Sequence, residues 1–137
     1  MATTPRAPEA GAPPYDPKKA ARTLAINRMV IGSVLSLAPT LGARGWIGSY
    51  ESRRPGARLF ARALGARDVG IGLGTLRALD RGGSARPWAQ AALMADGMDF
   101  VATLAAARSL PGGALALGLA MSGASTALGA WLTTALE

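Results

Sequence analysis

Four apolar stretches of helical length alternate along the chain with short polar turns that contain Gly, Pro and Arg. The last stretch, residues 112–136, contains no charged side chain, and about 20 apolar residues are enough to cross the hydrocarbon core of a bilayer. The other stretches cover residues 23–41, 55–79 and 87–110, and proline begins the second and third of them, as it often begins helices. The pattern predicts an all-α fold: a four-helix transmembrane bundle over residues 21–137.

The first 20 residues have a different composition from the rest of the chain. They hold five of the nine prolines, together with Ala, Thr and charged residues. Such a segment cannot bury a core, so residues 1–20 are predicted to form a disordered Pro-rich tail. The apolar residues begin only around Thr23, behind Lys18, Lys19 and Arg22, which favours an uncleaved first helix over a signal peptide cleaved near Ala43.

Composition narrows the possible chemistry. The 137 residues include no Cys and no His, which excludes disulfides, thiolate nucleophiles, His-ligated haem, Cys/His zinc sites and Ser-His-Asp triads. The net charge of +7 comes from Lys and Arg that are spread between the apolar stretches, without interleaved aromatic residues. That distribution disfavours nucleic-acid binding and is typical of membrane-flanking charge.

The distribution of Lys and Arg also predicts an orientation. Seven lie in the tail and the second loop, against five in the first and third loops, which favours both termini on the cytoplasmic side of a bacterial inner membrane. Trp46, Tyr50, Trp88 and Trp131 lie near the predicted helix ends, at headgroup depth. The alternative is an Ala- and Gly-rich soluble four-helix bundle.

Small residues recur at the spacing that lets helix backbones approach one another. Gly70 and Gly74 are four apart, as are Gly32 and Ser36 and also Gly118 and Ser122. Because helices in lipid associate through close packing, we expect helix-packing contacts at Gly65, Gly70 and Gly74.

Six ionisable residues fall inside the predicted spans, where charge is costly and marks a function or a structural lock. Arg67, Asp68, Asp96 and Asp99 lie near the predicted bilayer centre, whereas Arg28 and Arg62 lie closer to helix ends. Asp96 and Asp99 are three residues apart and share a helix face. We expect Arg67, helped by Arg28, to pair with both aspartates, and Asp68 to find its donor in Arg28 or Asn27. The network is interpreted first as a lock on helix register, and second as a proton relay or the polar floor of a ligand cavity.

These charged residues also carry a family resemblance. The stretch RALGARDVGIG at residues 62–72, followed by DGMD at 96–99, resembles small four-helix bacterial membrane proteins of uncharacterised function, of the actinobacterial type. More distantly it resembles the DoxX-like set, some of which are associated with quinone-linked oxidation or redox partners. The resemblance covers residues 23–136, and it implies architecture more than activity. Its matching positions are Arg28, Gly65, Arg67, Asp68, Asp96 and Asp99.

Two functions are compatible with these features. The first is a non-enzymatic accessory or scaffold protein in the lipid bilayer, with a membrane-protein partner or a second copy of the chain and with no cofactor. The alternative is a redox-associated or proton-coupled membrane module that binds a quinone-like amphiphile between its helices.

Overall fold

The computed structural model describes residues 15–136, and this part of the chain is helical, without strands. The prediction of an all-α fold is therefore confirmed. The elements in chain order are α1 (Pro17–Leu37), α2 (Pro39–Ile47), the 3-10 turn η1 (Glu51–Arg53), α3 (Pro55–Asp80), α4 (Arg86–Ala105) and α5 (Gly112–Ala135). Most of the predicted disordered tail, residues 1–14, lies outside the described residues.

The first helix begins earlier than its apolar pattern suggests. Asp16 caps it, because Oδ1 of Asp16 accepts hydrogen bonds from the backbone N–H groups of Lys18 (2.9 Å) and Lys19 (3.4 Å). Pro17 then occupies the first turn, where its missing N–H has no cost. The last residues of the predicted tail thus belong to α1. Arg28 consequently lies near the middle of its helix, which corrects the prediction that places it close to the helix start.

Pro39 divides the first predicted span, residues 23–41, into two helices. Proline has no N–H for the helical ladder, and its ring clashes with the preceding turn. The chain therefore ends α1 at Leu37 and continues into α2 with a bend of 108°. Leu35 packs with Ala43 and Ala61 at this corner, so α2 lies folded across the end of the molecule.

The remaining helices follow the sequence pattern closely, with one exception. α3 and α5 match the predicted ranges, whereas α4 ends at Ala105, ahead of the predicted residue 110. Its last turn tightens where the N–H of Ala107 bonds to the carbonyl of Leu104 (3.1 Å) and that of Ser109 to Ala106 (2.9 Å). Among the described helices, α5 alone is long and apolar enough to cross a membrane. α1 and α2 are long and apolar enough only when they are taken together as one bent span.

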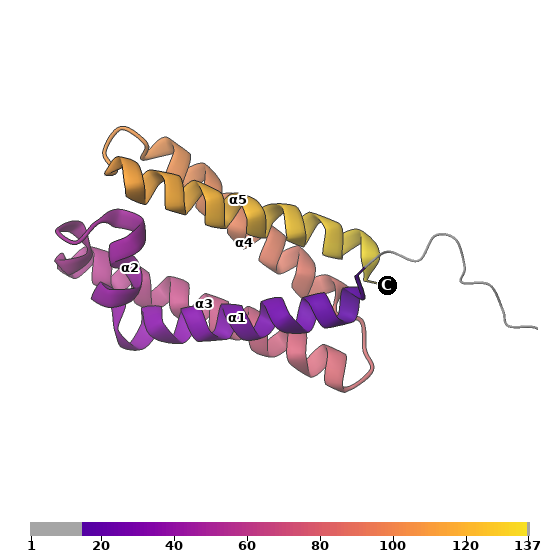
Figure 1. The fold of residues 1–137 in the computed structure, drawn as a ribbon. Helices are drawn as coiled ribbons and strands as arrows, with labels where there is room; N and C mark the ends of the chain where they lie inside the picture. Colours follow the sequence, from indigo (N-terminus) through magenta and orange to yellow (C-terminus); the bar gives the residue numbers. More distant parts are fainter. Residues whose placement is uncertain (1–14, 137) are drawn as a thin grey trace, which may run out of the picture.

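The four long helices form two closely packed pairs, α1 with α3 and α4 with α5 (Figure 1). In the first pair the backbones touch, since a Cβ on Gly32 would lie 2.6 Å from the carbonyl oxygen of Gly65. In the second pair, Gly129 lies against Leu93, where an added Cβ would be 3.2 Å from Leu93 Cα. Glycine thus sets the close approach within each pair.

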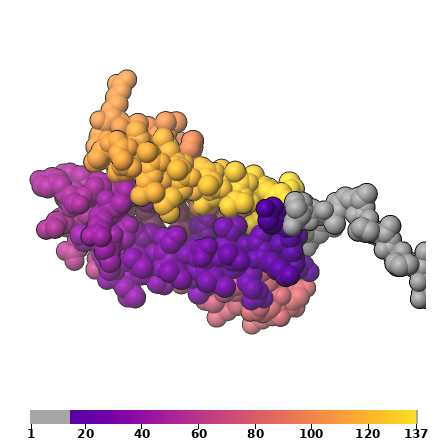
Figure 2. Space-filling model, viewed as in Figure 1, coloured from indigo at the N-terminus to yellow at the C-terminus, as the bar shows by residue number. Residues whose placement is uncertain are grey.

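The two pairs touch each other mainly at their ends. At one end an apolar cluster joins helices from both pairs through Ala21, Ala85, Ala89, Leu132 and Leu136. At the other end α2 packs against α5. Between these ends the pairs stand apart, and the space-filling view shows a hollow between α1, in indigo to purple, and α5, in yellow (Figure 2). The fold therefore places a cavity between two helix pairs.

Candidate ligand cavity with an Arg–Asp network

The space between the helix pairs is a partly open cavity of about 240 Å³. All four long helices and α2 contribute to its lining, which is mostly apolar. Its charged lining residues lie halfway along the helices, at Arg28, Asp68, Asp96 and Asp99. Uncharged polar side chains also line it, namely Asn27, Thr75, Ser122 and Ser125. Ligand sites in proteins have this character: apolar walls with a few convergent polar groups.

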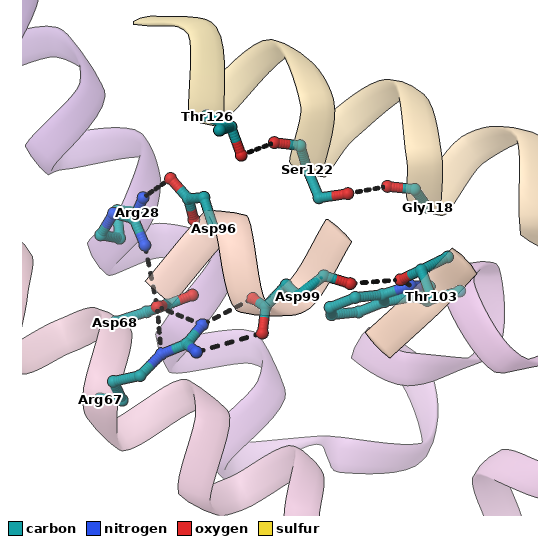
Figure 3. Close-up of polar contacts among 10 residues, drawn as sticks. Arg28, Arg67, Asp68, Asp96, Asp99, Thr103, Gly118, Ser122 and Thr126 are labelled. Atoms are coloured by element: carbon teal, nitrogen blue, oxygen red, sulfur yellow. Dashed lines mark hydrogen bonds and ion pairs between the residues drawn. The ribbon is translucent and has the colours of Figure 1, made fainter. Parts of the chain in front are cut away.

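Arg28 of α1 connects both halves of the network (Figure 3). Its Nη1 donates to Oδ1 of Asp68 on α3 at 3.0 Å, and its Nη2 donates to Oδ2 of Asp96 on α4. Only 14% of the Arg28 side chain is exposed, so the Arg28–Asp96 pair is a buried ion pair. One guanidinium thereby joins three helices, and it crosses from the α1/α3 pair to the α4/α5 pair.

Arg67 of α3 makes the second connection between the pairs. It binds Asp99 of α4 with both terminal nitrogens, at 3.1 Å from Nη1 to Oδ1 and 2.7 Å from Nη2 to Oδ2. Its Nε and Nη2 also lie 3.2 and 3.1 Å from Oδ1 of its neighbour Asp68. The structure thus brings together all five predicted network residues: Arg28, Arg67, Asp68, Asp96 and Asp99.

The details differ from the sequence-based expectation in two respects. Each aspartate of α4 has its own arginine, whereas the sequence suggested Arg67 as the main partner of both. Asp68 accepts from Arg28, as expected, but also from Arg67, because the Arg67 side chain curls back along its own helix. Arg62 stands apart from the network: its side chain is exposed, and it forms no ion pair with residues 15–136.

The network contains three carboxylates and two guanidinium groups. With all five groups ionised its charge is −1, and within the described part of the chain no further cation pairs with it. Two carboxylate oxygens, Oδ1 of Asp96 and Oδ2 of Asp68, accept no hydrogen bond from a described residue. Neither atom is fully enclosed by protein, and both residues line the cavity. The network therefore presents free acceptors to the cavity.

Three hydroxyl groups line the cavity, and two of them, those of Ser122 and Thr75, add acceptors to it, whereas the Ser125 hydroxyl donates to no described residue. Ser122 donates to the carbonyl of Gly118 (2.6 Å) and Thr75 to that of Ile71 (2.9 Å). Each hydroxyl has one hydrogen to donate and retains acceptor capacity on its oxygen. These two side chains thus satisfy their donors inside their own helices and offer oxygen atoms to the cavity.

Sequence reasoning missed the contact that holds α2 in place. The indole N–H of Trp46 donates to Oγ1 of Thr103 (3.0 Å), and that hydroxyl donates to the carbonyl of Asp99 (2.7 Å). A Cβ on Gly118 would lie 2.6 Å from Cδ1 of Trp46, so glycine makes room for the ring. The sequence suggested headgroup depth for Trp46, and the structure adds that its indole contacts α4 and α5. The sequence signal for this contact is the small-residue spacing of Gly118 and Ser122, which indicates a close approach to α5 at that point.

The three glycines predicted to pack helices have different environments. Gly65 is buried against Gly32 and Ser36 of α1, and Gly74 is buried against the Trp88 ring. Gly70 is exposed, and a Cβ there would meet nothing within 4 Å. Gly70 therefore packs against no other helix among residues 15–136, and a packing role for it stays a prediction. Gly72, which the prediction omitted, lies against Met29 and the carbonyl of Ala25.

The cavity offers binding groups more readily than catalytic ones. Within residues 15–136, no group of three acidic side chains is placed to hold a metal ion, and both arginines are engaged by carboxylates. Comparison with family models, curated proteins and solved structures finds no match for this chain. The resemblance to four-helix bacterial membrane proteins therefore rests on the sequence motifs themselves.

Proposed function

We propose that this chain is a multi-pass membrane protein that holds a small amphiphilic molecule in the cavity between its two helix pairs. The observation that carries the proposal is the juxtaposition of an apolar, partly open cavity with a charged network on its wall. An amphiphile would place its polar group against the network and its apolar part along the Ala- and Leu-lined walls. The volume of about 240 Å³ is just below the usual range for ligand pockets, roughly 300–1,000 Å³, so it suits one small molecule.

The outer surface supports a membrane location. Large apolar side chains are exposed on α1, α3 and α4, for example Leu37 (84%), Phe60 (70%) and Met94 (72%). Only 22% of the most apolar window of α5 is buried, so most of the apolar surface of α5 is free to contact lipid. Apolar surface of this extent is typical of protein that contacts lipid.

The dimensions of the helices support four membrane crossings. Among the four long helices α4 is the shortest, with 20 residues. At a rise of 1.5 Å per residue it is about 30 Å long, which equals a typical hydrocarbon thickness. All five network residues lie near the middle of their helices. In this arrangement the network lies at the bilayer centre, where each charge needs its partner. The proposed orientation has both termini in the cytoplasm of a bacterial cell.

The network serves the proposed function by fixing the distance between the two helix pairs. It ties α1 and α3 to α4 at mid-height, while the glycine contacts hold the two helices of each pair together. The same charged residues thus fix the positions of the helices and form the polar part of the cavity wall. No covalent chemistry is assigned to the chain, and the proposed module is non-enzymatic.

The proposal is tested by filling the cavity. Ala92 lines it from α4, and Ala92→Leu adds three carbons to that wall. The matched control is Ala102→Leu, an exposed position of the same helix outside the cavity. Binding of a small neutral amphiphile, phenylbutanol or a short-chain quinone, is measured in phosphatidylcholine nanodiscs. We expect saturable binding that weakens about tenfold or more in Ala92→Leu only; equal binding by both variants would reject the cavity as the site.

A second candidate function is that of a scaffold which associates with a membrane-protein partner or another copy of the chain. Its support is a stripe of exposed apolar residues on α4: Met94, Met98 and Val101. Because the chain has no cysteine, Met98→Cys provides a specific probe. Disulfide-linked dimers of Met98→Cys in membranes would favour self-association through α4, and monomers alone would count against it. Leu59→Cys, exposed on α3, is the control.

A further inference from the structure

We infer that the molecule held in the cavity is a hydrophobic cation: a small amphiphile with a protonated amine. This inference rests on the proposed function and deepens it, because it names the chemical class of the ligand. It departs from the quinone-like ligand suggested by the sequence resemblance.

The charge of the network is the first argument. Three aspartates and two arginines leave one negative charge uncompensated among the described residues. Asp96 is 7% exposed, and a buried carboxylate without full compensation is costly in a low-dielectric site. A cationic ligand brings the missing charge, whereas a quinone is neutral and leaves the excess in place.

The hydrogen-bond inventory is the second argument. Oδ1 of Asp96 and Oδ2 of Asp68 accept from no described donor, neither atom is fully enclosed, and both residues line the cavity. The hydroxyl groups of Ser122 and Thr75 donate their hydrogens to backbone carbonyls, so their oxygens can only accept from a ligand. A primary ammonium offers three donors and no acceptor, which complements a wall of this kind. A quinone offers two carbonyl acceptors, which can pair with the Asn27 amide or the Ser125 hydroxyl but leave both free carboxylate oxygens without a donor.

The aromatic residues in the lining are the third argument. Trp46 and Trp88 line the cavity on either side of its charged middle, one from α2 and one from α4. Indole rings attract cations, so two tryptophans in the lining suit a positively charged group. The apolar alanines and leucines between them accommodate the hydrocarbon part of the same molecule.

The test uses the purified full-length protein in phosphatidylcholine nanodiscs, which carry no net surface charge, with empty nanodiscs as the blank. Three probes of the same shape differ only in their polar group: phenylbutylamine, phenylbutanol and phenylbutyrate. A short-chain quinone is the fourth probe. Affinities are measured by equilibrium binding at neutral pH. We expect the amine to bind about tenfold or more tightly than the alcohol, and the carboxylate to bind more weakly than the alcohol.

Asp96→Asn removes the excess charge while it keeps an oxygen for Arg28. We expect this variant to lose the preference for the amine and to retain alcohol binding. Asp80→Asn is the matched control, because Asp80 is an exposed aspartate that pairs with Arg22 outside the cavity. It should keep the full amine preference. The wild-type probe series decides the question even where Asp96→Asn fails to fold.

The possible failures are distinct. If the alcohol or the quinone binds as tightly as the amine, the excess carboxylate is neutralised by a proton and the inference is overturned, while the proposed function stands. If none of the four probes shows saturable binding, both the inference and the proposed function are overturned.

Discussion

Arg67 and Asp99 meet face to face, with two parallel N–H to O contacts of 3.1 and 2.7 Å between α3 and α4. A bidentate pair of this kind fixes both the distance and the rotation of the helices that carry it. The two helix pairs have few other contacts at mid-height, where the cavity separates them. The pair is thus a direct determinant of the cavity's shape.

Breaking this pair should destabilise the protein. Arg67→Gln leaves Asp99 without its cation, which costs on the order of 3 kcal/mol for a buried pair. Asp99→Asn removes the bidentate contact together with one negative charge, and Arg67 keeps Asp68, so we expect a smaller cost. We expect a lower folded yield and a lower midpoint of unfolding in sodium dodecyl sulfate titrations. The double variant Arg67→Asp with Asp99→Arg should recover part of the loss. Arg22→Gln, which removes an exposed pair with Asp80, should cost less than about 1 kcal/mol. Single variants as stable as the wild type would refute the lock.

Alanine substitution at two glycines of α3 should have opposite effects. A Cβ on Gly65 would collide with the backbone of Gly32 and Ser36, so Gly65→Ala should destabilise by roughly 1–3 kcal/mol through overpacking. Gly70→Ala meets nothing and gains up to about 1 kcal/mol of helix propensity. Thermal unfolding followed by circular dichroism measures both. A destabilised Gly70→Ala would place that glycine in a contact with another chain.

The anchor of α2 can be tested by removing one hydrogen-bond donor. Trp46→Phe keeps a ring against Gly118 and loses the 3.0 Å bond to Thr103, with an expected cost of about 1 kcal/mol. Trp131→Phe is the control, since Trp131 packs against the apolar cluster and its indole donates no hydrogen bond to a described residue. The comparison of unfolding midpoints is decisive: equal losses for the two variants would mean that ring size, and not the bond, holds α2.

The proposed topology predicts opposite labelling of two loops. Ser84 lies between α3 and α4 and Ser109 between α4 and α5, and both are exposed. In intact cells, a membrane-impermeant maleimide should label Ser109→Cys, whereas Ser84→Cys should react only after lysis. The native chain has no cysteine, so it provides the unlabelled background. Labelling of both positions in intact cells would contradict four crossings.

The residue types of the network and the helical fold were predictable, but the geometry was not. Charged residues in otherwise apolar stretches stand out in any sequence, and proline marks the starts of α3 and α4. The cap at Asp16 lies outside the apolar pattern, so it concealed the true start of α1. Spacing alone does not reveal which way a helix is rotated, so it predicts the same contact for Gly70 as for Gly74. The cavity follows from how two pairs dock, which depends on contacts far apart in the sequence, such as that of Trp46 with Thr103.

The central claim, that the space between the helix pairs receives a ligand, is tested most directly by protection of a thiol placed inside it. Ser125 lines the cavity from α5, and Thr134 is an exposed residue of the same helix outside it. Ser125→Cys and Thr134→Cys are alkylated in nanodiscs with and without saturating phenylbutylamine. We predict that the amine slows alkylation of Ser125→Cys about tenfold or more and leaves that of Thr134→Cys unchanged. Equal rates for Ser125→Cys with and without the amine, at a concentration where binding is saturated, would contradict the claim.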